Sequence, residues 1–120
     1  MRKRVLSIMI MGLILVPFLF SAVAAKTLKI GSMSPLTGPY ASDGTDIKNG
    51  ARAAIEVFEE AGGMPGYDKI EFFPQDTACD PRQAVAAANK LINLEVVGVI
   101  GAYCSSSTIP SSETLDEEDV

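Results

Sequence analysis

Two segments of this 120-residue sequence are rich in hydroxyl-bearing side chains, and they have the clearest potential for ligand chemistry. Residues 34–44 combine three Ser or Thr with two Pro, two Gly and one Asp. Residues 102–108 contain Ser105, Ser106 and Ser107 just before a helical pattern. Hydroxyls beside the free N–H groups of a helix start can hold an anion, so the second segment suits a carboxylate. The alternative is that one Ser is an N-cap and the others are solvated.

The remaining reactive residue types do not form a catalytic or metal-binding pattern. Because the sequence has no His, it cannot form a Ser-His-Asp triad, a Cys-His pair or a His-based metal site. Two Cys are too few for an all-cysteine zinc site, no glycine-rich phosphate loop is present, and the Asp spacing fits no calcium loop. We therefore predict no enzymatic activity, cofactor or metal. A further hypothesis is an exported hydrolase that uses Ser105. Cleavage of an ester or amide substrate that is lost on Ser105→Ala would support it.

The N-terminus has the three parts of a secretory signal peptide. Residues 2–4 are basic, residues 5–20 are uncharged and largely apolar, and residues 21–25 are small. Cleavage is predicted after Ala24 or Ala25, which makes residues 1–25 the signal and places the product in the periplasm. The alternative is an uncleaved anchor, but a membrane span needs about 20 apolar residues.

Charge and cysteine content restrict the partners and the compartment. Residues 26–120 contain 7 basic and 15 acidic residues, so nucleic acid is not an expected partner. In an exported protein, Cys79 and Cys104 favour one disulfide, worth about 3 kcal/mol in the loop-entropy model. The alternative is two separate buried thiols.

Three strands are predicted to alternate with helices. The first strand spans residues 26–33. The second spans residues 69–75 and lies at an edge of the sheet, because Pro74 has no N–H to donate to a neighbouring strand. The third spans residues 96–102 and is buried on both faces. This order predicts right-handed crossovers and an α/β fold: an open parallel sheet of strand order 2-1-3 with helices on both faces. Ligands bind such sheets where the crossover direction reverses, which brings segments 34–44 and 102–108 to one site.

Three helices are predicted from apolar spacing and end signals. The first begins at Asp46 and ends at Gly62 and Gly63, with an apolar stripe of Ile47, Ala51, Ala54, Ile55 and Phe58. The second spans residues 81–93 after a capping box in which Asp80 accepts first-turn amides and Gln83 reaches back; its stripe is Ala84, Val85, Ala88, Leu91 and Ile92. The third begins at Ile109, with Pro110 in its first turn.

Two side chains of the first loop have open roles. Tyr40 is either an apolar wall for a ligand or an ordinary packing aromatic. Asp43 either meets an ammonium group or caps the first helix, and the cap is the favoured interpretation.

Four motifs carry a family resemblance: KIGSMSPLTGPYASDG (29–44), AGGMPG (61–66), DTACDPRQAVAAANKL (76–91) and VIGAYCSSSTIP (99–110). From Lys26 onward the sequence resembles the leucine/isoleucine/valine-binding proteins of bacterial ABC importers. The resemblance implies a type I periplasmic binding protein, in which two α/β lobes close on an amino acid. It also implies that Cys79 and Cys104 form a disulfide and that Ser105 holds the ligand carboxylate. From their place in the two loops, Ser106, Tyr103, Tyr40 and Asp43 are predicted as further substrate-binding residues.

The sequence also departs from the family pattern. Members often carry an aromatic residue where Asp43 stands, so the expected ligand is a branched-chain amino acid or a related polar amino acid, amide or carboxylate. Family members are much longer, so residues 26–120 are expected to be an incomplete N-terminal lobe that is unstable alone. The expected partner is an ABC permease in the membrane, with a monomer at full length. The alternative function is a ligand-sensing domain of the same fold in a receptor.

Overall fold

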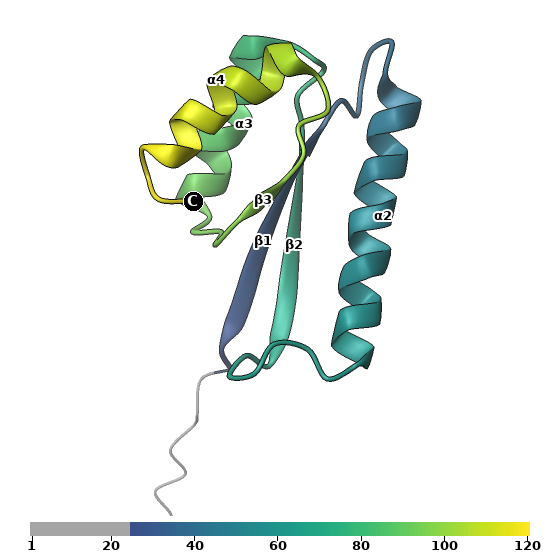
Figure 1. Ribbon diagram of the computed structural model, residues 1–120, viewed down its shortest axis with the longest axis vertical. Coiled ribbons are helices and arrows are strands. Elements are labelled where there is room, and N and C mark those ends of the chain that lie inside the picture. The colour runs from purple at the N-terminus through teal and green to yellow at the C-terminus, as the bar shows by residue number, and fades with distance from the viewer. Residues whose placement is uncertain (1–24) are drawn as a thin grey trace, which may run out of the picture.

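The computed structural model describes residues 25–120 and builds them into three strands and three helices (Figure 1). The predicted signal peptide falls almost entirely on residues 1–24, which lie outside the described residues. In chain order the elements are β1 Thr27–Ser34, α2 Ala41–Glu60, β2 Lys69–Asp76, α3 Pro81–Asn93, β3 Val99–Ile100 and α4 Ser105–Asp116. The predicted alternation of strands and helices is confirmed.

The sheet is parallel and its strand order is β2-β1-β3, as predicted. β1 pairs with β2 over its whole length, from Thr27 opposite Lys69 to Ser34 opposite Asp76. Pro74 lies in the edge strand β2, where a missing ladder donor is tolerated. β1 also pairs with β3, Gly31 opposite Val99, so the crossover direction reverses between these two strands.

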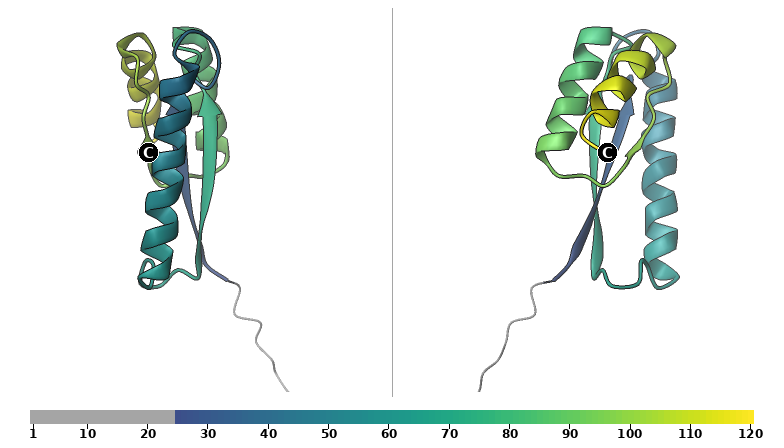
Figure 2. Two further views of the ribbon diagram at one scale, coloured as in Figure 1. Left: turned by 90° about the vertical axis from the view of Figure 1, so that its right-hand side faces the viewer. Right: turned by 60° about the vertical axis from the view of Figure 1, so that its left-hand side comes forward.

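Helices cover both faces of the sheet (Figure 2). α3 and α4 lie together on one face and α2 lies along the other. The core is on the α3 side, where Met33 of β1 contacts the apolar face of α3; its buried members are Met33, Ala84, Ala87, Ala88, Leu91, Val96 and Ala102. Within residues 25–120, no helix is both long and apolar enough to cross a membrane.

The start of α3 follows its sequence signal with one difference. Asp80 is the N-cap, and its Oδ1 accepts from the amide of Gln83 at 2.8 Å. Gln83 does not reach back to Asp80, which corrects the predicted capping box. Its side-chain amide instead donates to the Asp76 carbonyl at 3.2 Å, because that carbonyl ends β2 beside the helix start. The side chain thereby ties α3 to the end of β2.

The helix α2 differs from the prediction in its start and its burial. It begins at Ala41, five residues before Asp46, and it ends as expected before Gly62 and Gly63, whose φ angles are +112° and +63°. Ala54 and Phe58 of the predicted stripe are exposed, while the other three members are half-buried. The reason is that α2 packs mainly against β1 and β2, and these two strands leave part of the stripe without a partner within residues 25–120.

The C-terminal elements also correct the prediction. β3 is two residues long rather than the whole of 96–102, and Val97 and Ile100 are exposed rather than buried on both faces. Its outer edge has no neighbouring strand within residues 25–120, and α2 does not extend over it. α4 begins at Ser105 instead of Ile109, which places Pro110 inside the helix rather than in its first turn.

Candidate functional site

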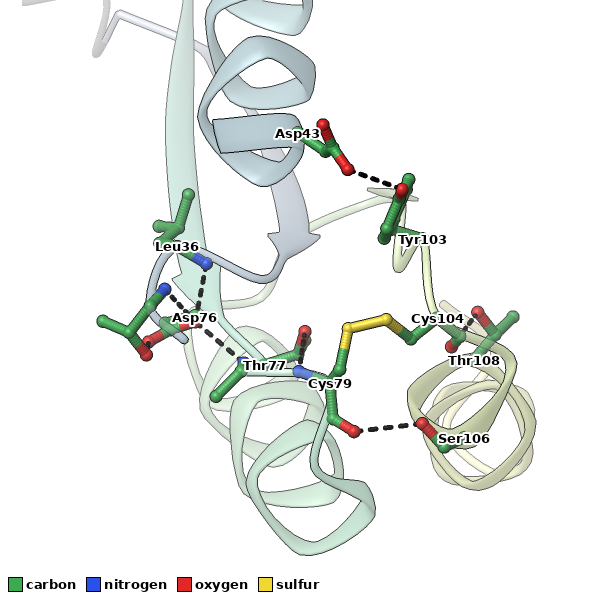
Figure 3. The surroundings of a disulfide bond; sticks show 11 residues. Leu36, Asp43, Asp76, Thr77, Cys79, Tyr103, Cys104, Ser106 and Thr108 are labelled. Atoms are coloured by element: carbon green, nitrogen blue, oxygen red, sulfur yellow. Dashed lines mark hydrogen bonds between the residues drawn. A yellow bond between two sulfur atoms is a disulfide. The ribbon is translucent and has the colours of Figure 1, made fainter. Parts of the chain in front are cut away.

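The site lies at the edge of the sheet where the parallel strands β1 and β3 end. The segment after β1 leads into the N-terminus of α2, and the segment after β3 leads into the N-terminus of α4. The loop between β2 and α3 reaches the same edge, so three connections meet there (Figure 3). We call this edge the rim and define it by Tyr40, Asp43, Tyr103, Ser105 and Ser106.

A disulfide joins two of the rim's supports. Cys79, in the loop after β2, is bonded to Cys104, the N-cap residue of α4, and their Cα atoms are 5.4 Å apart. The predicted pairing is therefore confirmed. Two outer strands of a three-stranded sheet are about 10 Å apart, so both loops curl toward each other over the end of β1. The bond fixes where α4 begins.

Ser106 adds a second connection at the same place. Its hydroxyl donates to the carbonyl of Cys79 at 3.0 Å (Figure 3). Because the Ser106 hydroxyl already donates its proton within the protein, the donor that Ser106 can offer a ligand is its backbone N–H.

The N-terminus of α4 presents backbone donors at the rim. The carbonyl of Cys104 accepts from the amides of Ser107 and Thr108, both at 2.9 Å, whereas the amides of Ser105 and Ser106 have no acceptor among residues 25–120. None of the three Ser residues is the N-cap, which corrects that alternative: Cys104 holds the position and caps without a side-chain hydrogen bond. Ser107 is fully buried, so Ser105 and Ser106 are the exposed Ser residues of the first turn.

Asp43 and Tyr103 meet across the rim although 60 residues separate them. The Tyr103 hydroxyl donates to Asp43 Oδ2 at 2.7 Å, and the ring of Tyr40 lies 6.0 Å from that of Tyr103, centroid to centroid. Asp43 is not the cap of α2, which corrects the favoured interpretation: Tyr40 is the N-cap residue, and Asp43 lies in the first turn. Accepting this hydrogen bond, the Asp43 carboxylate raises the pKa of Tyr103 above its ordinary value.

Asp76, which lies beside the rim, has a structural role that the sequence analysis did not predict. Its Oδ1 accepts from the amides of Leu36 at 2.7 Å and Ala78 at 2.8 Å, and its Oδ2 accepts from the Thr37 hydroxyl. Partial burial acts to raise the pKa of Asp76, but the hydrogen bonds from the Thr37 hydroxyl and the three amides of Ala78, Leu36 and Thr37 outweigh it, and the pKa is lowered. Asp76 therefore holds the loop after β1 against the loop that carries Cys79.

We expect Asp76→Asn to lower the free energy of unfolding by roughly 1 to 3 kcal/mol at pH 7. The reason is that the NH₂ group of Asn is itself a donor and would face N–H and O–H groups whose hydrogen bonds the carboxylate accepts. The folded-state pKa is lowered, so the ionised carboxylate stabilises the fold fully above the ordinary value near 3.8, and this contribution is lost as pH falls below it. Urea unfolding of both proteins between pH 7 and pH 2 measures the difference, which should shrink in acid. Asp46→Asn is the control, since no side-chain hydrogen bond involves Asp46 in the described residues.

An open parallel sheet with polar connections at the carboxyl ends of its strands is the architecture of ligand-binding α/β domains. Residues 27–120 match the family model described as "Periplasmic binding protein", and the chain belongs to this family. The family comprises periplasmic substrate-binding proteins rather than enzymes.

Curated relatives are similar over most of the chain. It is 46% identical over 99 residues to a leucine-, isoleucine-, valine-, threonine- and alanine-binding protein of Pseudomonas aeruginosa, and 39% identical over 102 residues to the Leu/Ile/Val-binding protein of Escherichia coli. These matches cover 82% and 84% of the chain but 26% and 28% of the relatives. The chain thus spans about a quarter of the length of the relatives.

Solved structures agree with the fold. One is LivJ of Streptococcus pneumoniae, a branched-chain amino acid transporter substrate-binding protein solved in complex with isoleucine. It superposes with a TM-score of 0.73 at 28% identity, over 78% of this chain and 27% of that one. A type 1 periplasmic binding protein of Bordetella pertussis gives a TM-score of 0.70 at 30% identity, over 78% and 25% of the respective chains.

Proposed function

We propose that this chain belongs to the extracytoplasmic solute-binding component of an ABC importer, which captures branched-chain or related amino acids between two lobes. In this proposal residues 27–120 form part of the first lobe, and the rim is its share of the ligand site. The observation that carries it is the pair of amides without an acceptor among residues 25–120 at the start of α4, next to a disulfide and to the Asp43–Tyr103 hydrogen bond. The names of the relatives support the class of ligand.

The rim offers complementary groups for an α-amino acid. The ligand carboxylate accepts hydrogen bonds from the amides of Ser105 and Ser106 and from the Ser105 hydroxyl, aided by the positive end of the α4 dipole. The rings of Tyr40 and Tyr103, each about half exposed, border this position and can cover the ligand's carbon skeleton. A second lobe closing over the rim removes water and strengthens these contacts. The chain's own residues thus supply binding and orientation, without a chemical step.

The test is Ser105→Ala, with binding measured by titration calorimetry on the protein as the cell exports it. We expect the affinity for the amino acid to fall by roughly 1 to 3 kcal/mol, because a buried carboxylate loses a donor. Ser112→Ala is the matched control: Ser112 lies on the same helix and its hydroxyl donates only to the Ile109 carbonyl. Equal affinities for wild type and Ser105→Ala would remove Ser105 from the site.

The proposal includes export through a cleaved signal, action as a monomer and delivery to a membrane permease. Residue 26 is already fixed on the fold, because the Lys26 amide donates to Asp68 at 2.6 Å and the Lys26 carbonyl accepts from the Asp68 amide at 2.8 Å. Lys26, one of the two residues with which the cleaved protein would begin, therefore belongs to the folded domain. N-terminal sequencing of the periplasmic protein should start at Ala25 or Lys26, and a start at Met1 would contradict the cleavage.

A further inference from the structure

β2 has an outer edge without a neighbouring strand within residues 25–120, on the side away from β1 (Figure 1). Successive residues of a strand direct their backbone N–H and C=O groups to opposite sides. The Thr77 amide, just beyond β2, donates to the Ser34 carbonyl of β1 at 3.0 Å, so the odd-numbered residues face β1. The even-numbered residues therefore direct their backbone groups to the outer edge: Ile70, Phe72, Pro74 and Asp76.

An edge of this composition is a template for a further strand. β2 is eight residues long, and its residues 70–73 read Ile-Glu-Phe-Phe, which combines high β propensity with apolar side chains. Unpaired backbone groups on such an edge can bind any extended segment. In a solution of this protein, β2 of a second copy fits best, because a symmetric pair places the same apolar side chains opposite each other.

Three of the four outward positions are already closed. Glu59, near the C-terminal end of α2, reaches over to β2, and its Oε1 accepts from the Ile70 amide at 2.6 Å. Pro74 has no N–H to donate. The outward carbonyl of Asp76 accepts from the side-chain amide of Gln83 at 3.2 Å. The edge thus lacks the continuous row of donors and acceptors that a further strand requires.

Phe72, the remaining outward position, lies beside charged groups. The guanidinium carbon of Arg52, on α2, is 5.9 Å from the centre of the Phe72 ring. Lys69 and Glu71 form an ion pair on the same strand. A strand that docked here would have to remove water from these groups, which is unfavourable for charges. Charged side chains on an edge strand are a common protection against pairing between copies.

We propose that Glu59 and Pro74 together keep the outer edge of β2 closed to β2 of a second copy of this chain. Glu59 blocks the Ile70 N–H with its carboxylate, and Pro74 leaves a permanent gap in the row of donors. The inference gives a structural cause for the monomeric state and rests on that part of the proposed function. It does not depend on the ligand, because Ile70 lies near the start of β2, at the opposite end of the sheet from the rim.

Sedimentation equilibrium on the exported protein tests the proposal with variants that restore the missing donors. Glu59→Ala frees the Ile70 amide, and Pro74→Thr supplies another N–H without adding an apolar side chain. The double variant should self-associate at least about tenfold more tightly than wild type, because two more hydrogen bonds become available to a second strand. Each single variant should lie between the two. Amide hydrogen exchange should show Phe72 protected in the associated form of the double variant and not in its monomer.

Glu59→Gln and Glu60→Ala are the matched controls. Gln keeps a side-chain carbonyl that can accept from the Ile70 amide, so this variant should associate less than Glu59→Ala does. Glu60 is the next residue of α2 and is also exposed. Its removal takes away the same charge without freeing the Ile70 amide, so Glu60→Ala should stay monomeric.

The outcomes separate this inference from the function beneath it. If wild type self-associates with Ile70 and Phe72 protected, the closed edge and the monomeric state are both overturned. If the double variant is folded by circular dichroism and no more associated than wild type, the role of Glu59 and Pro74 is refuted while the solute-binding function stands. Should the double variant not fold, the Ile70 amide decides: it should exchange at least about tenfold faster in Glu59→Ala than in wild type, and equal rates would refute the block by Glu59.

Discussion

Gly44→Ala should lower the free energy of unfolding by about 3 kcal/mol, because the site has no room for a methyl group. Gly44 is buried in the first turn of α2, where its amide donates to the Tyr40 carbonyl and its carbonyl accepts from the Ser34 hydroxyl. A Cβ atom would lie 2.0 Å from the carbonyl oxygen of Pro35, which is main chain and cannot rotate away. The start of α2 must therefore move from the end of β1, and Asp43 moves with it.

Gly50→Ala is the matched control within the same helix. A Cβ atom at Gly50 meets nothing within 4 Å, so this change should stabilise the protein by up to about 1 kcal/mol through helix propensity. Chemical denaturation of wild type and both variants measures the two effects, which should have opposite signs. Equal stability of Gly44→Ala and wild type would show that α2 does not contact the end of β1 as closely as described.

Much of the fold could be predicted because its signals are local. Asp80 and Pro81 mark the start of α3 through residue types that favour an N-cap and a first helical position, and the structure confirms them. Pro74 restricts its strand to an edge, and that single restriction leads to the strand order 2-1-3. Once the order is known, the carboxyl ends of β1 and β3 must meet at one edge, which places the rim.

The starts of α2 and α4 could not be read in the same way. Their N-cap residues are Tyr40 and Cys104, which are not preferred caps and make no side-chain cap hydrogen bond. The sequence therefore carries no local mark at either start, and both helices are longer at this end than predicted. The error matters for the site, since Asp43 becomes a first-turn helical residue and Ser105 becomes the first residue of α4.

Contacts between distant segments account for the rest of the rim. Asp76 accepts from residues about 40 positions away, and Tyr103 donates to a residue 60 positions away. Neither pairing follows from spacing. A local clue to Asp76 did exist: an Asp that accepts from the amide two residues later, here that of Ala78, forms an Asx-turn, which this residue type favours after a strand.

Removing the disulfide should be the second large effect. We expect Cys79→Ser with Cys104→Ser to lower the free energy of unfolding by about 3 kcal/mol, because the unfolded chain regains the freedom of a loop of 25 residues. The affinity for the amino acid should fall as well, since Cys104 no longer fixes the amides of Ser105 and Ser106 at the rim. Chemical denaturation and calorimetry on the same preparations measure both changes.

Two further measurements assign the effect to the bond itself. A reducing agent should destabilise wild type and leave the double Ser variant unchanged, because that variant has no bond to reduce. Ser106→Ala, which removes only the hydrogen bond to the Cys79 carbonyl, should cost about 1 kcal/mol in wild type. If the double variant loses stability but binds the amino acid as tightly as wild type, the disulfide supports the fold without positioning α4, and the hydrogen bonds of the loops must hold the rim in place.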